Sequence, residues 1–193
     1  NGTLNLTDSI TVIGEKCFYN LSQINGTLNL ANIQSIGDSA FEGCKSLAGQ
    51  INIGSKLTEI GSKAFCGCGE LKGQLLLSEG LETLKEFTFY GCQKLTGPLT
   101  IPDSVTSIES SCFQNCVGLT SLEFGFNSKL TRFGKSCFEN CTGFTDNLDL
   151  PKTVTEINEF AFAGCTGFDG KLTFKDEIKI ISNYSFYNCS KFT

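Results

Sequence analysis

The 193-residue sequence contains no histidine, no run of lysine or arginine, and no long apolar stretch. Without histidine it lacks the commonest general base, the commonest neutral metal ligand and every Ser-His or Cys-His nucleophile pair. Nucleic-acid binders usually carry a basic face, whereas this chain has a net charge of −5. No segment approaches the roughly 18 apolar residues that span a bilayer. Nucleic-acid partners and membrane insertion by this segment are therefore not expected.

The chain does contain one unit repeated along its length. An early copy has Phe18 followed three residues later by Leu21, and in seven later copies a phenylalanine precedes a cysteine by the same step. Successive phenylalanines are 23 to 25 residues apart. These seven are Phe41, Phe65, Phe89, Phe113, Phe138, Phe162 and Phe186.

Each copy has eight apolar positions, and Thr88 and Ser185 are the two polar exceptions in the whole array. No charged residue falls on any of them. One unit alone has too few apolar side chains to offset an ordering entropy of roughly 1–2 kcal/mol per residue, so neighbouring units must share a core. We predict a single domain over residues 1–193, built from eight repeats of about 24 residues. The fifth copy illustrates the positions with Leu99, Ile101, Val105, Ile108, Cys112, Phe113, Cys116 and Leu119.

The predicted fold class is an α/β, β-rich solenoid, a right-handed superhelix. The Leu-x-Leu segment alternates with period two and predicts a short strand, and stacked strands form a parallel sheet on one face. A second extended piece carries Val105 and Ile108. The segment around Ala40-Phe41 is spaced like one helical turn, so we expect turns or a short, irregular helix on the other face.

Two places break the repeat rhythm. Leu122 follows Leu119 by one residue fewer than in equivalent pairs such as Leu95 and Leu99. Between Phe124 and Leu130 there are two more residues than in most copies, centred on Gly125-Phe126-Asn127. Insertions in repeat arrays map to surface loops, often on a binding side. Neither end carries a polar capping repeat, so we interpret the chain as a segment of a longer protein whose caps, export signal and anchor lie outside it.

The motif Leu-x-Ile-Pro-x-Ser-Val-x-x-Ile, followed by Phe-x-x-Cys-x-x-Leu over Leu99–Leu119, resembles the Treponema-type leucine-rich repeats of BspA-like proteins. The Ile-Gly-x-x-Ala-Phe pieces at Ile36–Phe41 and Ile60–Phe65 resemble them too. The resemblance implies a surface or secreted protein of bacteria or mucosal protists. The Gly-x-Leu-x-Leu and Asn-Cys pieces are more similar to the protist, trichomonad-like branch. The family resemblance further implies adhesion or host interaction through matrix or cell-surface proteins. It implies no catalytic residue and no cofactor.

Eleven cysteines leave three interpretations open. Seven occupy the repeat position after phenylalanine, Cys17, Cys112 and Cys137 directly precede one, and Cys66 stands alone. The favoured interpretation is a column of small, buried, reduced thiols. Disulfides between stacked copies are the second, although an odd count argues against a complete set. A metal site is the third, and none is expected because the close pairs are products of the repeat.

Seven Asn-x-Ser/Thr sequons occur where chance predicts roughly three, an excess that suits a secreted eukaryotic protein. The competing explanation is that asparagine is favoured in solenoid turns. Asn140 and Asn188 lie beside core cysteines and are expected to be poorly accessible. The sequons begin at Asn1, Asn5, Asn20, Asn25, Asn140, Asn183 and Asn188.

Two surfaces are candidates for binding. The first is the outward, concave side of the strand sheet, with Gln50, Asn52, Gln74, Leu76, Thr100, Ser121, Glu123, Asn147, Asp149, Lys171 and Thr173. The second is aromatic and flanks the repeated phenylalanine, with Tyr19, Phe87, Tyr90, Phe160, Tyr184 and Tyr187. The alternative for the second set is that the rings lie over the turns and complete the core.

The leading functional hypothesis is a protein-binding module of a cell-surface or secreted protein. The alternative is an intracellular interaction scaffold, where eleven reduced thiols are at home. No enzyme activity is expected, because the acidic residues are scattered over exposed positions and no Gly-rich segment has phosphate-loop spacing.

Overall fold

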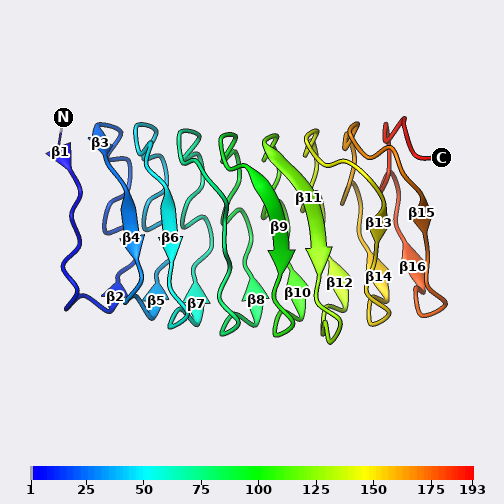
Figure 1. Ribbon diagram of the computed structural model, residues 1–193, viewed down its shortest axis with the longest axis horizontal. Helices are drawn as coiled ribbons and strands as arrows, with labels where there is room; N and C mark the ends of the chain where they lie inside the picture. Colours follow the sequence, from blue (N-terminus) through cyan, green and yellow to red (C-terminus); the bar gives the residue numbers. More distant parts are fainter. Residues whose placement is uncertain (1) are drawn as a thin grey trace.

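The computed structural model describes residues 2–193 as a stack of coils, each made from one copy of the repeat (Figure 1). All strand pairings are parallel, and no helix occurs within residues 2–193. The two ends of the chain lie at opposite ends of the stack, and the row of coils is almost straight in this view (Figure 1). The predicted solenoid is confirmed, with strands and turns but no helical part.

The Leu-x-Leu segments form the first row of strands, as predicted, but they pair only two at a time. The first and fourth copies are missing from this row, because residues 4–6 and 75–77 form no strand. In the fourth copy two isolated bridges, at Lys72 and Gly73, precede the segment. The pairs are β4 (Leu28–Leu30) with β6 (Ile51–Ile53), β9 (Gly97–Ile101) with β11 (Leu119–Phe124), and β13 (Leu148–Asp149) with β15 (Leu172–Thr173). A further pair, β1 (Gly2–Thr3) with β3 (Ile24–Asn25), lies just before the Leu-x-Leu segments of the first two copies.

The second extended piece forms a more continuous row. A three-stranded sheet contains β2 (Val12–Ile13), β5 (Ser35–Ile36) and β7 (Glu59–Ile60). A five-stranded sheet contains β8 (Thr83–Leu84), β10 (Ser107–Ile108), β12 (Arg132–Phe133), β14 (Glu156–Ile157) and β16 (Ile180–Ile181). The longest sheet therefore lies here and not on the Leu-x-Leu segments, because the apolar residue of this row stands five positions before the repeated phenylalanine in every copy, whereas the copies differ in length elsewhere.

The segment around Ala40-Phe41 is a ladder of turns, so the short helix allowed by its spacing is absent. Two residues per copy, two before and two after the repeated phenylalanine, have positive φ, such as Ser39 at 55° and Gly43 at 75°. Left-handed residues four positions apart prevent an α-helix. Every second backbone N–H instead bonds to the next copy, as in the 2.8 Å bond from Phe41 N to Ala64 O, and those between bond to the carbonyl three residues earlier, as from Cys44 N to Phe41 O.

The repeated phenylalanines form one column through the core. Their rings stack face to face from Phe18 to Phe186, with neighbouring centroids 5.0–5.5 Å apart and interplanar angles of 13° or less. In the second to seventh copies the repeat positions are buried, apart from the half-buried Leu77 and Phe124. The buried Thr88 donates to the carbonyls of Gly61 and Lys85, so this polar exception is satisfied.

The cysteine column runs beside the rings. Each of its seven thiols donates to the carbonyl of the phenylalanine in the preceding copy, with Sγ–O distances of 3.0–3.2 Å. All eleven cysteines are free, as the favoured interpretation predicted, although Cys17 is exposed and Cys66 and Cys189 are half-buried. Desolvation raises the pKa of Cys116 to about 12 and that of Cys189 to about 11, so the thiols stay protonated.

Candidate binding face and the groove within it

The predicted strand-face residues point to solvent. Ten of the eleven are exposed and Ser121 is half-buried. Alternation along a short strand places one side chain outward between two core residues, as Asn52 stands exposed between the buried Ile51 and Ile53. Asn52, Thr100, Ser121, Glu123, Asp149 and Thr173 lie in strands of the first row, while Gln50, Gln74, Leu76, Asn147 and Lys171 lie beside or between them.

Hydrogen bonds connect several of these side chains across neighbouring copies. The amide of Asn52 donates to Asn29 Oδ1 at 3.2 Å, and the hydroxyl of Thr100 donates to Glu123 Oε2 at 3.2 Å. Ser121 donates to the other oxygen of Glu123 at 3.0 Å. The carboxylate of Glu123 is therefore held in one orientation on the surface of β11.

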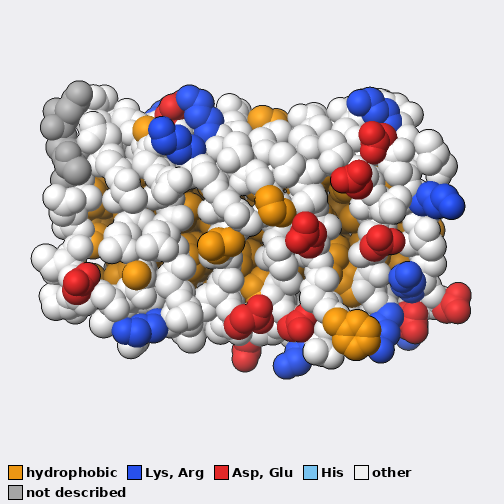
Figure 2. All heavy atoms as spheres, in the orientation of Figure 1, with side chains coloured by type: hydrophobic (Ala, Val, Ile, Leu, Met, Phe, Trp, Pro, Cys, Tyr) orange, Lys and Arg blue, Asp and Glu red, His pale blue; other side chains and the backbone are white. Residues whose placement is uncertain are grey.

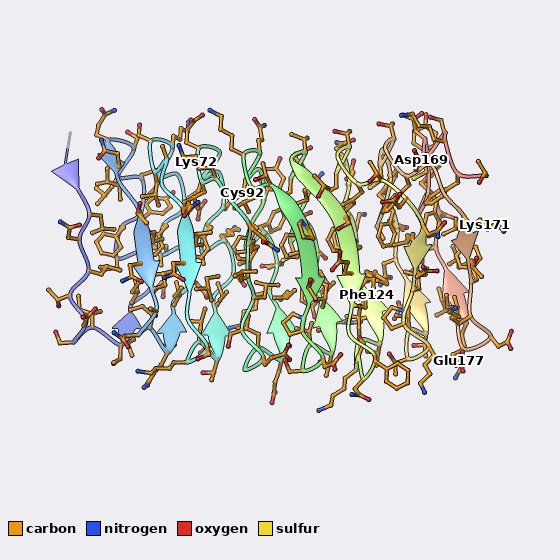
Figure 3. The ribbon with its side chains drawn as sticks, in the orientation of Figure 1. Lys72, Cys92, Phe124, Asp169, Lys171 and Glu177 are labelled. Atoms are coloured by element: carbon orange, nitrogen blue, oxygen red, sulfur yellow. The ribbon has the colours of Figure 1, made fainter. Side chains whose placement is uncertain are left out.

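A groove of about 360 Å³ opens on this face between β11 and β13. The predicted residues Ser121, Glu123, Asn147 and Asp149 line it, so the structure brings these four together. Thr145 and Asp146 complete the polar wall, and Leu122 and Phe124 supply the apolar part. In Figure 3, Phe124 lies at the lower end of β11, while Asp169 and Lys171 lie further along the stack.

The groove lies beside the irregular sixth copy. The shortened step from Leu119 to Leu122 produces a register shift between Leu119 and Ser121, where β11 pairs with β9. On its other side β11 has no ladder partner, because β13 pairs with β15 in a separate sheet. At this edge the backbone N–H and the hydroxyl of Thr145 both donate to the carbonyl oxygen of Thr120, at 2.9 and 3.3 Å.

The charge in the groove is of one sign. Glu123, Asp146 and Asp149 form no ion pair among residues 2–193, whereas four carboxylates elsewhere are paired with a cation of a neighbouring copy, as in Lys135–Glu159 at 2.9 Å. Acidic side chains are more frequent over the C-terminal half of this face than over the N-terminal half, with Lys and Arg side chains toward its margins (Figure 2). Strand alternation could not identify Thr145 and Asp146, because they lie in the turn before β13 and not in a strand.

The aromatic set lies in the turns around the repeated phenylalanines, here called the corner turns, and divides into separate clusters. Phe87 and Tyr90 are half-buried, with ring centroids 5.8 Å apart, and Lys63 Nζ lies 5.7 Å from the Phe87 ring. The half-buried Phe160 stacks on the exposed Tyr184 at 5.1 Å, and the exposed Tyr187 packs edge-on against Tyr184. The exposed Tyr19 stands in the first copy. The sequence pattern did not reveal this division.

The described sequon asparagines are mostly exposed. Asn5, Asn20, Asn140, Asn183 and Asn188 are exposed, Asn25 is half-buried, and Asn1 lies outside the described residues. The expectation that Asn140 and Asn188 are poorly accessible is wrong. Both have a positive φ, 61° and 59°, at a corner where the side chain lies on the surface although the adjacent cysteine points into the core.

Residues 2–193 contain no group of three or more Cys, Asp or Glu residues placed to hold a metal ion. They also contain no helix that is long and apolar enough to cross a bilayer.

Stacked parallel strands, a shared phenylalanine column and an outward polar row together define a leucine-rich-repeat solenoid. The chain belongs to the family described as the BspA type leucine rich repeat region, whose model matches residues 2–72 and 73–193 in six copies. Such repeat modules generally bind proteins and are generally not enzymes.

Two solved structures are similar in fold. A leucine-rich repeat protein from Bacteroides ovatus superposes with a TM-score of 0.63 at 24% identity, over 97% of this chain and 58% of the other. The leucine rich repeat protein of T. pallidum superposes with a TM-score of 0.60 at 22% identity, over 99% of this chain and 77% of the other. This chain thus spans a little over half the length of the Bacteroides protein. Among curated proteins, none matches it.

Proposed function

We propose that residues 1–193 form one leucine-rich-repeat domain of a cell-surface or secreted protein, and that it binds protein ligands in adhesion or host interaction. The observation that carries this proposal is the first strand row. Its inward positions are uniformly apolar, whereas its outward positions are exposed and chemically varied, from Asn52 to Glu123 and Lys171. A repeated core with free outward positions is how solenoids present an extended binding surface.

Exposure of five sequon asparagines supports a secreted protein of the protist, trichomonad-like branch. Both solved relatives come from bacteria, so this part of the proposal depends on the sequons and on the Gly-x-Leu-x-Leu and Asn-Cys pieces of the sequence. Host extracellular matrix or cell-surface proteins are the proposed ligands. Mass spectrometry of the protein from its native cells tests for glycans at Asn5, Asn20, Asn140, Asn183 and Asn188, and surface labelling of intact cells tests the location.

An intracellular scaffold is the second candidate, and the eleven free thiols favour it. The hydrogen-bonded thiol column is also compatible with export, because seven of these thiols are bonded to backbone carbonyls and mostly buried. Absence of surface labelling together with absence of glycans would favour the scaffold.

Binding is tested by a screen of the purified chain against extracellular matrix and cell-surface proteins. Any ligand found is measured again with two variant sets. Alanine substitutions at Asn52, Thr100, Glu123 and Asp149 remove side chains from the strand row, and alanine at Tyr90, Tyr184 and Tyr187 removes the aromatic alternative. We expect the first set to weaken binding and the second to leave it unchanged. The reverse result would transfer the binding site to the aromatic corner turns.

A further inference from the structure

The irregular sixth copy has two features that the repeat does not require. One is the groove between β11 and β13, whose facing strand edges lack ladder partners. The other is Phe126 in the inserted loop, with 95% of its surface exposed, the highest value among the exposed large apolar residues of the described chain. Leaving a phenylalanine in water forgoes roughly 1.5–3 kcal/mol of burial. The loop follows directly after β11, so Phe126 is two residues beyond Phe124, which lines the groove.

The charge of this groove distinguishes it from the other shallow grooves. Its charged lining residues are Glu123, Asp146 and Asp149, with no cation. Three further grooves each include a cationic residue, namely Lys85, Lys72, or Lys16 with Lys63. Three carboxylates around one small volume repel each other, and a cation that enters reduces this repulsion.

The hydrogen bonds show which carboxylates are oriented. Thr100 and Ser121 hold Glu123, and Thr145 Oγ1 donates to Asp146 Oδ2 at 3.3 Å. Asp149 stands outward in β13 on the other wall. A cationic side chain between the walls can thus meet carboxylates from two copies, and the edges of β11 and β13 that have no ladder partner face the same space.

Building on the proposed function, we propose that this groove binds an extended basic segment of a protein partner, with one arginine or lysine between Glu123 and Asp149 and a neighbouring apolar side chain against Phe126. Charge complementarity selects the cation, and the exposed ring selects an apolar neighbour. Aromatic residues are enriched in protein–protein interfaces relative to the rest of the protein surface.

The test titrates the isotope-labelled chain with a blocked pentapeptide in which one arginine stands between two leucines. Binding is monitored through the backbone amide signals of the chain in NMR spectra. A second peptide has glutamate in place of arginine, and a third has serines in place of the leucines. We expect the first peptide to shift signals within residues 121–126 and 145–149. The glutamate peptide should shift none of them.

Substitutions in the groove test which side chains bind the peptide. Glu123→Gln combined with Asp149→Asn should weaken binding of the first peptide about five- to tenfold, the size expected for one or two lost charge pairs. The matched control is Glu79→Gln with Asp176→Asn, two exposed carboxylates without an ion pair, which should leave binding unchanged. Phe126→Ala should weaken binding of the leucine-containing peptide but leave binding of the serine-containing peptide unchanged.

Three outcomes would overturn the inference: equal shifts with the glutamate peptide, shifts confined to another face, or the same shifts with Ca²⁺ alone. A protein ligand from the screen whose affinity is unchanged by the groove variants would also overturn it while leaving the proposed function intact. Specific binding of the arginine peptide without any protein ligand would support the groove and count against adhesion.

Discussion

The thiol of Cys116 donates a hydrogen bond to the backbone carbonyl of Phe89, 27 residues earlier in the sequence, with a Sγ–O distance of 3.1 Å. The same relationship recurs between each cysteine of the column and the phenylalanine of the copy before it. The cysteine is therefore a hydrogen-bonding link between copies as well as a core residue.

Replacing Cys116 tests this link. We expect Cys116→Ala to lower the free energy of unfolding by about 1–2 kcal/mol, because a bond to the Phe89 carbonyl and some buried volume are lost. Cys116→Ser keeps a donor and should recover part of the loss. Urea unfolding measures both. Cys17→Ala is the control, since Cys17 is exposed and should change stability by less than about 0.5 kcal/mol. Equal losses for Ala and Ser would mean that only packing matters.

Stability should fall in alkaline solution. Burial raises the pKa of Cys116 to about 12 and that of Cys189 to about 11, whereas the unfolded thiol titrates near 9.0. Above pH 9 the unfolded chain has lost protons that the folded chain keeps, so each added pH unit favours unfolding until the folded thiols ionise as well. Below pH 9 this contribution is fully present. Urea midpoints between pH 7 and 10.5, under reducing conditions, should show the decline, and Cys116→Ser should reduce its slope.

Thiol labelling should separate the cysteines by exposure. Cys17 is exposed and should react rapidly with a disulfide reagent. Cys66 is half-buried and desolvation raises its pKa, so it should react slowly. The column thiols from Cys68 to Cys165 should react only on unfolding. Mass spectrometry after timed labelling identifies the modified residues. Rapid modification of Cys116 in the folded chain would contradict the buried column.

The phenylalanine column should be most sensitive in its middle. Phe113 stacks at 5.3 Å on both Phe89 and Phe138, and Phe113→Ala should cost about 3–5 kcal/mol. Phe18 is half-buried with one stacked neighbour in the column, so Phe18→Ala should cost clearly less. Chemical denaturation compares the two. A larger loss at Phe18 would be incompatible with stability as a sum over neighbours.

Hydrogen exchange should show a gradient along the stack. The repeat positions of the first and last copies are mostly half-buried or exposed, such as Leu6 and Ile181, whereas those of the middle copies are buried. Regions with fewer buried contacts open more readily. Backbone amides of the first and eighth copies should therefore exchange faster than those of the fifth copy. In the fifth copy, for example, the Phe113 N–H donates to the backbone carbonyl of Cys137 at 2.8 Å.

Periodicity predicted the parts of the fold that every copy shares. The spacing of Phe41, Phe65 and Phe89 predicted stacked units with one core, because only a regular array places equivalent residues side by side. It did not predict the corner turns. A helical turn and a pair of left-handed residues around Phe41 have similar apolar spacing. They differ in their hydrogen bonds, because a helix bonds every N–H along the chain, whereas here every second N–H bonds to the next copy.

The groove was only partly predictable. Strand alternation identified Ser121, Glu123, Asn147 and Asp149, but it gave no reason to group them or to add Asp146. The shortened step at Leu119–Leu122 indicated an irregularity without showing where the strand row separates. Separation depends on which neighbour β11 pairs with, and that is decided by contacts between copies.

The sequence by itself determined the repeat, the apolar columns and the outward alternation, because these depend on the spacing of residue types along one chain. Only the tertiary structure decided that the longest sheet lies in the second strand row, that each column thiol bonds to the copy before it, and that the face opens between β11 and β13. Each of these depends on how one copy is aligned against the next, because that alignment decides which backbone N–H and C=O groups become hydrogen-bond partners.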